Sequence, residues 1–423
     1  MFSVQTLIFR ATVLFMVSAL LSYYSLLAFQ SFVKFEDKTA FNLWYLRADF
    51  LITLLSLSAF VYFYANEGKV SKWYNYMAFV GVLWLITKLF INTGMLLGEA
   101  FRLISFFVDW LHLKLSSSNV AENISMPGRR AFIGQAAVLV ASIPFTGLLY
   151  GLFKGKYDFK AHKQTLYFDD LPVAFDGFTI TQVSDLHLGS FDSVEDVKRG
   201  VEMIKELQSD LFVFTGDLVN NYAKEAEPWK NLFSSIKAPF GQYSIMGNHD
   251  YGDYAHWESP VDKQDNLKQL HQVHAEMGYK LLLNESVSIT KNSDTIKLIG
   301  VENWGKPPFA QYGKLEKAIE GVAESDFKIL LSHDPSHWEG EILDHPYPFH
   351  LTLSGHTHGA QMGIEIPFIK WSPVKYIYKQ WAGLYTKDTQ HLYVNRGFGF
   401  LGYPGRIGIW PEITLLTLKK TNK

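Results

Sequence analysis

Cysteine is absent from the 423-residue sequence, which excludes both disulfide bonds and thiolate metal ligands. Any metal ion must therefore be held by histidine, carboxylate or asparagine side chains. The sequence also lacks a strong charge of either sign, because its net charge is -2 and its pI is about 6.7. Nucleic-acid-binding proteins carry basic patches, so we expect no nucleic-acid partner. Internal repeats and low-complexity tracts are missing as well.

Long apolar runs with few charges fill the first part of the chain. Residues 11–29, 41–64 and 73–97 are each close to or longer than the ~20 residues that span a bilayer. Trp44 and Trp73 stand near the starts of the second and third runs, as aromatic residues do at a membrane interface. We therefore predict several membrane-spanning helices rather than the buried helices of a soluble domain.

Residues 101–115 show a different pattern, with polar residues on one helical face and apolar residues on the other. This pattern fits an interfacial helix, a span that hides its polar stripe, or an extension of the third span. We assign residues 1–115 to a multi-span helical membrane region and 116–130 to a linker. Residues 131–152 form a further apolar run, which we interpret as another transmembrane or signal-anchor helix.

Basic residues at the two ends of this last run give conflicting indications of orientation. Arg129 and Arg130 precede the run and resemble a twin-arginine export signal, although an ordinary span with basic flanks fits equally. If they stay in the cytoplasm, the following domain lies outside. Four lysines crowd the opposite end: Lys154, Lys156, Lys160 and Lys163. We expect a protein integral to the cytoplasmic (inner) membrane, with an extracytoplasmic second domain as the working orientation.

From about residue 157, short β-rich runs alternate with amphipathic helices, and polar clusters follow the apolar runs. Successive strands of an α/β sheet bring their carboxyl ends to one edge, so these clusters are expected to meet there. Residues two apart on an extended chain point to the same side and can hold one ion together. The clusters are Asp185-Leu186-His187, Gly216-Asp217, Gly247-Asn248-His249-Asp250, Ser332-His333-Asp334 and Gly355-His356-Thr357-His358.

Each cluster has a simpler explanation when it is taken alone. Asp185 and Asp217 can cap helices, and an Asn-His pair can form a turn. Helix caps explain neither His187 nor the Asn-His pair, so the five clusters together predict a metal site. By contrast, His271 and His274 lie three residues apart on a predicted helix, and we expect them to face solvent.

The ordered clusters resemble the calcineurin-like metallophosphoesterase superfamily over roughly residues 165–420. The motif that begins at Gly355 and the ending from Asn395-Arg396-Gly397 through Arg406 to Pro411-Glu412-Ile413 are similar to the membrane-associated bacterial branch. That branch often carries glycine where Ala360 stands here. The resemblance implies a four-layer α/β/β/α sandwich over residues 157–423, with two divalent metal ions (Mn, Fe, Zn or Co) at the sheet edges.

The resemblance also implies a role for each residue of the clusters. His249 would protonate the leaving oxygen or steady the transition state, with Asp250 holding its ring. Asp217 would bridge the two ions. The implied ligands are Asp185, His187, Asp217 and His358 for one ion, and Asp217, Asn248, His333 and His356 for the other.

We therefore predict a membrane-anchored, dinuclear metal-dependent phosphoesterase that hydrolyses a phosphate ester or pyrophosphate by attack of a metal-activated water. Its expected partners are the lipid bilayer and a phosphate-ester substrate, with a phospholipid or a nucleotide-linked lipid among the candidates. An alternative is a membrane sensor or scaffold with a ligand-binding but non-catalytic phosphoesterase domain. Missing ligands would favour that alternative, and none is missing.

A third hypothesis is a transporter-like function of the first part of the chain. Charged residues inside apolar runs suggest it, because such residues often mark a functional site. We expect most of them to lie near the ends of the spans, where their side chains can reach the membrane interface. They are Arg47, Asp49, Lys88 and Asp109.

Overall fold

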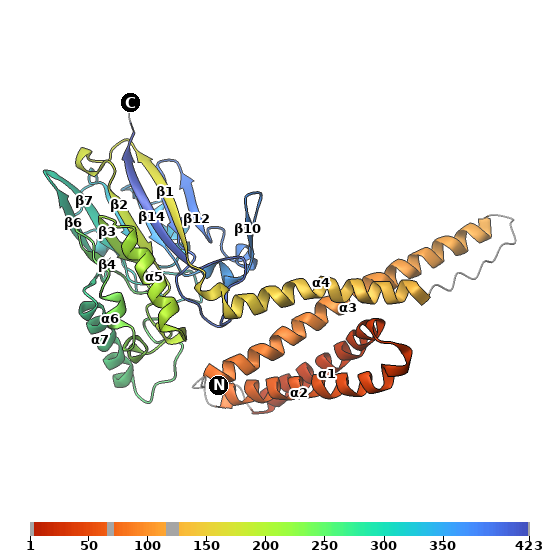
Figure 1. The fold of residues 1–423 in the computed structure, drawn as a ribbon. Coiled ribbons are helices and arrows are strands. Elements are labelled where there is room, and N and C mark those ends of the chain that lie inside the picture. Colours follow the sequence, from red (N-terminus) through yellow and green to blue (C-terminus); the bar gives the residue numbers. More distant parts are fainter. Residues whose placement is uncertain (1–3, 66–71, 116–126, 422–423) are drawn as a thin grey trace. The chain divides into compact units, whose positions relative to one another are not determined.

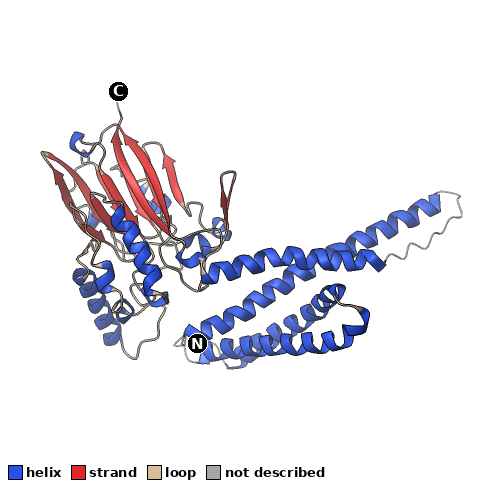
Figure 2. Ribbon diagram, in the orientation of Figure 1, coloured by secondary structure: helices blue, strands red, loops and turns tan. Residues whose placement is uncertain are grey.

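The computed structural model describes residues 4–65, 72–115 and 127–421. The chain forms two compact units, Met1–Leu149 and Tyr150–Lys423. The first is helical, and the second is built around β-sheets (Figures 1 and 2).

Four long helices make up the described part of the first unit, and the last of them ends inside the second unit. Each contains a stretch that is long and apolar enough to cross a membrane, so the prediction of several membrane-spanning helices is confirmed. Two short 3-10 turns, η1 (Gln30–Phe32) and η2 (Phe35–Asp37), connect the first two helices. The helices are α1 (Val4–Phe29), α2 (Lys38–Ala65), α3 (Lys72–Leu115) and α4 (Pro127–Phe153).

The third helix includes the stretch that the sequence left ambiguous. Residues 101–115 continue α3 without a break, and the whole helix has 44 residues. This stretch therefore continues the third helix. Residues 127–130, which we assigned to the linker, are the first residues of α4, while residues 116–126 lie outside the described residues.

A buried ion pair joins α2 and α3 inside the membrane unit. Lys88 Nζ lies 2.8 Å from Asp49 Oδ1 and also donates hydrogen bonds to two serines of α1. The indole of Trp84 donates to the same carboxylate oxygen at 2.6 Å. Both charged residues lie well inside the candidate spans Lys38–Tyr62 and Tyr76–His112, so our expectation of positions near the ends is wrong for this pair. Each charge is tolerated there because the other compensates it away from lipid.

Two six-stranded sheets form the centre of the second unit. In spatial order, the first contains β1 (Lys160–Phe168), β14 (Glu412–Lys420), β2 (Thr179–Val183), β3 (Leu211–Phe214), β4 (Gln242–Ser244) and β5 (Lys280–Leu281). The second contains β12 (Gly383–Lys387), β13 (Gln390–Val394), β9 (Leu351–Ser354), β8 (Lys328–Leu331), β7 (Asp294–Gly300) and β6 (Glu285–Lys291). A separate two-stranded hairpin consists of β10 (Ile364–Ile366) and β11 (Ile369–Trp371).

The two sheets pack against each other through alternate residues of their strands. In β3, Leu211 and Val213 join the apolar core between the sheets, which also includes Ile329 and Leu353 of the second sheet. Phe212 and Phe214 point the opposite way and join a different apolar core, on the outer face of the first sheet. This period of two is what a strand that is buried on both sides requires.

Helices cover the outer faces of both sheets. Over the first sheet lie α5 (Val194–Glu206), α6 (Lys230–Phe233) and α7 (Pro260–Glu276), and over the second lies α8 (Leu315–Ala318) with a π-helical turn, Trp338–Ile342. Ser193 caps α5 by accepting a hydrogen bond from Asp196 N. The predicted α/β/β/α sandwich that follows a helical transmembrane region is therefore confirmed.

One prediction about α7 is wrong. His274 does not face solvent: it is fully buried, and its Nδ1 lies 3.0 Å from the Ser244 hydroxyl at the end of β4. Burial lowers the pKa of His274 to about 3, so the ring stays neutral. His271 is half-buried, and neither histidine belongs to the clusters of potential metal ligands in the described residues.

Candidate metal centre

The polar clusters meet because they follow strands that run parallel. β2, β3 and β4 pair in parallel in the first sheet, and β8 and β9 pair in parallel in the second. The pairing continues past the strand ends, since Asp185 N donates to Gly216 O at 2.9 Å and Gly355 N donates to His333 O at 2.9 Å. Both sheets therefore deliver their polar side chains to the same edge, as expected for α/β sheets.

The backbone at this edge is held in an uncommon conformation. Five residues of the polar clusters have a positive φ, between 46° and 72°. Non-glycine residues adopt this left-handed region at a cost of ~1–2 kcal/mol each. Such strain typically collects at functional sites, where the surrounding structure maintains it. The five residues are Asp185, His187, Asp217, His356 and His358.

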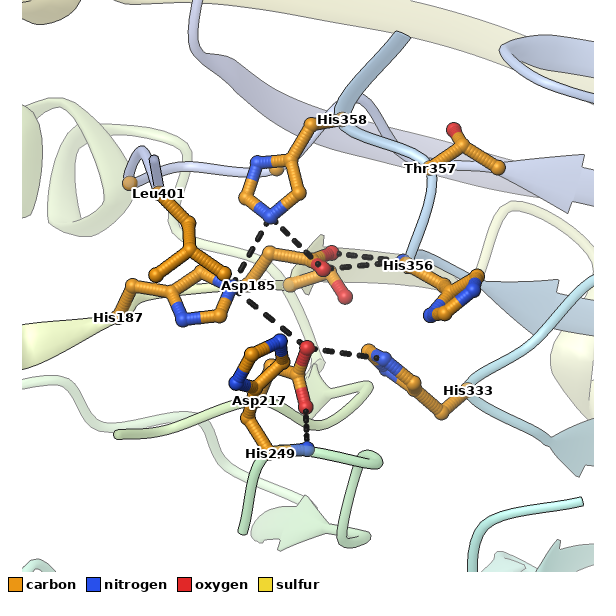
Figure 3. A network of polar contacts seen from close by, with 12 residues as sticks. Asp185, His187, Asp217, His249, His333, His356, Thr357, His358 and Leu401 are labelled. Carbon is orange, nitrogen blue, oxygen red and sulfur yellow. Dashed lines mark hydrogen bonds and ion pairs between the residues drawn. The ribbon is translucent and has the colours of Figure 1, made fainter. Parts of the chain in front are cut away.

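One group of side chains converges around His187 (Figure 3). The Nε2 atoms of His187 and His358 face each other at 3.0 Å, and Asp185 Oδ1 lies 3.3 Å from His358 Nε2. The other ring nitrogen of His187, Nδ1, is buried and has no hydrogen-bond partner among the residues that the structure describes. All three side chains are buried, and their ligand atoms lie within 4.8 Å of one another.

A second group converges around His333. Its Nε2 lies 3.2 Å from Asp217 Oδ2 and 3.2 Å from Asn248 Oδ1. Asn248 Oδ1 also lies 2.8 Å from His356 Nδ1. Asp217 Oδ2 is in addition 3.5 Å from His187 Nε2, so a single oxygen atom faces both groups. The structure thus brings together all seven residues that the sequence analysis named as metal ligands.

The chemistry of these donors fits two divalent cations. Imidazole nitrogens and carboxylate and amide oxygens converge in each group, and two histidine nitrogens face each other at 3.0 Å. Divalent transition metals prefer this mixture of ligands.

Burial and charge set the protonation of these ligands. Burial lowers the pKa of His187 to about 3 and also lowers the pKa of His356 and His358. For His333, burial is outweighed by the adjacent Asp217 carboxylate, which raises the pKa of His333 to about 10. The same contact holds the pKa of Asp217 well below its usual range, although burial alone would raise it. Three imidazoles are therefore neutral near pH 7, whereas His333 carries a proton when no metal is bound.

His249 lies beside the two groups rather than within them. Its Nδ1 is 2.9 Å from Asn220 O, so this nitrogen donates to the carbonyl and Nε2 is left without a proton in the neutral ring. Its backbone N donates to Asp217 Oδ1 at 2.9 Å. The His249 ring stands edge-to-face against His187, with 5.0 Å between ring centroids. The ring is therefore fixed next to the candidate metal centre by a backbone carbonyl.

Asp250 does not hold the ring of His249, contrary to the role that the sequence analysis gave it. Its carboxylate is fully buried and accepts hydrogen bonds from backbone N–H groups on both sides of the site. Asp217 N and Gly247 N each donate to Oδ2 at 2.9 Å, and Leu218 N donates to Oδ1 at 2.8 Å. The turn after Gly247 directs this side chain back toward the end of β3. Asp250 thus maintains the loop that presents Asp217.

Three further residues contact the candidate ligands and were missed by sequence reasoning. Tyr378 OH lies 2.8 Å from His356 Nε2, and Tyr254 OH accepts from Asn248 Nδ2 at 2.9 Å. Arg406 is fully buried, and its Nη2 lies 3.1 Å from His358 Nδ1. Arg406 lies within the C-terminal motif that the sequence analysis quoted, so that motif could have identified it as a site residue. The two tyrosines lie in loops without any motif.

Two family models match this chain. Residues 5–156 match the model described as "Probable Calcineurin-like phosphoesterase, transmembrane domain", and residues 178–360 match "Calcineurin-like phosphoesterase".

Several curated proteins are similar in sequence. The uncharacterized metallophosphoesterase YkuE of Bacillus subtilis is 32% identical over 70% of this chain and 98% of its own length. A transmembrane protein with metallophosphoesterase domain from Danio rerio is 28% identical over 72% of this chain and 67% of its own length. The UDP-2,3-diacylglucosamine pyrophosphatase LpxG of Chlamydia trachomatis is 28% identical over 53% of this chain and 78% of its own length. This chain therefore belongs to the calcineurin-like phosphoesterases and is a membrane-associated metallophosphoesterase.

Proposed function

We propose that this protein is a dinuclear metal-dependent hydrolase that cleaves a phosphate ester or pyrophosphate bond of a lipid-linked substrate. The observation that carries the proposal is the position of Asp217 Oδ2, which lies 3.5 Å from His187 Nε2 and 3.2 Å from His333 Nε2. One carboxylate oxygen can then belong to two adjacent metal sites. Such a bridge is what a two-metal phosphoesterase requires.

The residues that would hold the ions divide into two sets that share Asp217. One set is Asp185, His187, Asp217 and His358, and the other is Asp217, Asn248, His333 and His356. Divalent ions in such a centre lower the pKa of a bound water and offset the negative charge of the phosphoryl group.

His249 would complete the reaction at the leaving group. Because Nδ1 donates to Asn220 O, Nε2 is the atom free to carry a proton toward a leaving oxygen. The proton reaches Nε2 when the ring is in its imidazolium form, in which both nitrogens donate. The contact with Asn220 O keeps the ring in one orientation while this proton is transferred.

Two observations support a lipid-linked substrate. The described residues include four helices long and apolar enough to cross a membrane, so the hydrolase unit is tethered near lipid. In addition, the name of the Chlamydia relative describes hydrolysis of a pyrophosphate bond in a diacylated sugar nucleotide. We extend that class of substrate to this chain as part of the proposal.

We also propose that the hydrolase unit lies on the outer side of the cytoplasmic membrane. Arg129 and Arg130 stand at the start of α4, where the positive-inside tendency favours the cytoplasm. Of the four lysines at the other end, Lys156 carries less weight, because it is buried in a contact with Asp192 within the folded unit. A single cysteine introduced at exposed Val261 of this cysteine-free chain tests the orientation. Labelling by an impermeant maleimide in intact spheroplasts supports the outer location, and labelling only after lysis contradicts it.

The activity is tested with full-length protein that has been purified in detergent, stripped of metal and reloaded with Mn²⁺. The substrates are p-nitrophenyl phosphate, bis(p-nitrophenyl) phosphate and a diacylated sugar nucleotide, each with and without chelator. The control is Asp217→Asn, because asparagine keeps the shape and tolerates the φ of 61° at this position. We expect chelator-sensitive turnover that falls by ~10³-fold in the control, since metal ions supply several kcal/mol to such reactions.

The competing sensor or scaffold function gives a different result in the same assay. Two bound metals per chain without turnover of any of these substrates would favour it. Turnover that survives chelation, or an Asp217→Asn protein that keeps both metals and full activity, would contradict the dinuclear hydrolase.

A further inference from the structure

The β10–β11 hairpin has its polar and apolar faces reversed relative to an ordinary surface hairpin. Ile364 and Ile366 of β10 and Ile369 of β11 are about half exposed, and Phe368 in the turn is 96% exposed. Paired residues lie on the same face of a hairpin, so Ile366 and Ile369 form one continuous outward face. A soluble hairpin normally places such residues against the protein core.

The charged residues of the hairpin point the other way, toward the protein. Glu365 accepts two hydrogen bonds from the Arg396 guanidinium, at 2.9 and 2.6 Å. Its cross-strand partner Lys370 donates to Ala382 O at 2.6 Å and lies over the Trp381 ring. These polar contacts fix the orientation of the hairpin, so its apolar side chains point away from the protein.

The apolar surface extends beyond the hairpin into the following segment. Tyr376 is 74% exposed and Ile377 is 80% exposed. Most other exposed large apolar residues of this unit are isolated on separate elements, at Tyr167, Val173, Val194, Tyr254 and Val261. We call the patch formed by Ile364, Ile366, Phe368, Ile369, Tyr376 and Ile377 the apolar hairpin face.

The base of the hairpin is tied to the end of the last membrane-spanning helix. Gly363 N, just before β10, donates to Ile407 O at 2.9 Å. The adjacent Arg406 N donates to Gly151 O in the last turn of α4 at 3.2 Å, and a Cβ on Gly151 would lie 2.5 Å from Arg406 O. The candidate span Ala131–Phe153 ends two residues beyond Gly151. The hairpin therefore begins next to the point where the chain leaves the bilayer.

The same segment leads to the candidate metal centre. Tyr378 directly follows Ile377, and its hydroxyl lies 2.8 Å from His356 Nε2 and 3.2 Å from Asp334 Oδ2. The apolar hairpin face is thus connected at one end to the end of the membrane span and at the other to a candidate metal ligand.

We propose that the apolar hairpin face inserts into the interfacial region of the lipid bilayer and receives the substrate from it. The substrate is then a membrane lipid whose phosphoryl group reaches the metal centre while its acyl chains remain in the membrane. Interfacial segments bury their apolar side chains ~5–10 Å into the headgroup region, a depth that a hairpin of three-residue strands can span. This inference rests on the proposed function for the identity of the substrate, but the insertion itself does not.

Insertion is tested by spin labelling of the full-length, cysteine-free protein in lipid nanodiscs. Phe368→Cys carries the label on the apolar hairpin face, and Val173→Cys, which is 71% exposed, provides the control. Val173 follows the far end of β1, and nine strand residues at ~3.3 Å each separate that end from Lys160 near the membrane exit. We expect the label at 368 to be accessible to oxygen and shielded from a water-soluble nickel complex, and the label at 173 to show the opposite. Equal exposure of both labels to the nickel complex would overturn the proposal.

Delivery of the substrate is tested by the ratio of kcat/KM for a vesicle-borne lipid phosphoester to that for bis(p-nitrophenyl) phosphate. We expect Phe368→Asp to lower this ratio by ~10-fold or more, because one apolar anchor of this size is lost, and Val173→Asp to leave it unchanged. An unchanged ratio in Phe368→Asp would refute delivery through the hairpin. If no substrate is turned over by the unmodified protein, the proposed function fails, while the spin-label result still decides insertion.

Discussion

The protonated state of His333 leads to a sharp prediction about metal binding. Without metal, the Asp217 carboxylate at 3.2 Å raises the pKa of His333 to about 10, so this imidazole carries a proton at neutral pH. A metal ligand must give up that proton, so binding at this site should release one proton below pH 10. The apparent affinity for the metal ion at this site therefore rises with pH, by roughly tenfold per pH unit. This is ~1.36 kcal/mol in the free energy of binding.

The other ligands should add little to this dependence between pH 7 and 8.5. Burial lowers the pKa of His187 to about 3 and lowers the pKa of His356 and His358, so these rings have no proton to lose. Burial raises the pKa of Asp185 to about 6, and this carboxyl is mostly ionised above pH 7. Release of about one proton per chain, by the ion that binds at the His333 site, is therefore the signature of His333.

The assay is calorimetric titration of Mn²⁺ or Zn²⁺ into metal-free protein, in buffers that differ in ionisation enthalpy. His333→Gln should remove about one released proton, whereas His358→Gln, the matched control, should not. A bound water whose pKa falls to ~7 can release a further fraction of a proton, so the comparison between variants isolates the histidine. An affinity that does not change between pH 7 and 8.5, or a proton release that persists in His333→Gln, would refute the reasoning.

Three further predictions concern catalysis and stability. His249→Ala should lower kcat by ~10²–10⁴-fold with two metals still bound, as measured by steady-state kinetics and elemental analysis; loss of metal would reassign this residue as a ligand. Asp250→Ala should leave buried backbone donors unpaired at ~1–3 kcal/mol each, and should lower both the melting temperature and metal retention; an unchanged melting temperature would contradict its role in supporting the Asp217 loop. Lys88→Met should destabilise the membrane unit by ~3–5 kcal/mol, because Asp49 is left buried without its partner. The double variant with Asp49→Asn should recover much of that loss. Unfolding of the protein in detergent measures both effects.

The positions of the seven candidate ligands could be anticipated because they depend on a simple rule. Each cluster directly follows an apolar run, and the strands that these runs form are parallel neighbours within their sheets. Asp185, His187 and Asp217 lie beyond the ends of their strands and have a positive φ, so the backbone of these loops, and not the alternation of an extended strand, directs their side chains. The local sequence places these residues in loops that follow strands, and the parallel order of the strands brings the loops together.

The errors arose where the orientation of a side chain depends on distant contacts. Asp250 was expected to support its neighbour His249, but the turn directs its carboxylate to N–H groups 32 and 33 residues earlier in the chain. The spacing of His271 and His274 on one predicted helix suggests a solvent-facing pair, yet the Ser244 hydroxyl of β4 lies 3.0 Å from His274 Nδ1. The pairing of Lys88 with Asp49 joins two helices across 39 residues, which no local pattern in either apolar run indicates.

The place of β14 in the first sheet has a consequence for biosynthesis. This strand lies between β1 and β2, pairing in parallel with the former and antiparallel with the latter. Residues 412–420 are translated after every other strand of the two sheets, so the ribosome has made those strands before the first sheet can close. Until then, β1 and β2 each present an unpaired edge, and such edges favour misassembly. Premature termination a few codons before residue 412 should therefore give an inserted but unfolded product that membrane proteases remove, rather than a partly active enzyme.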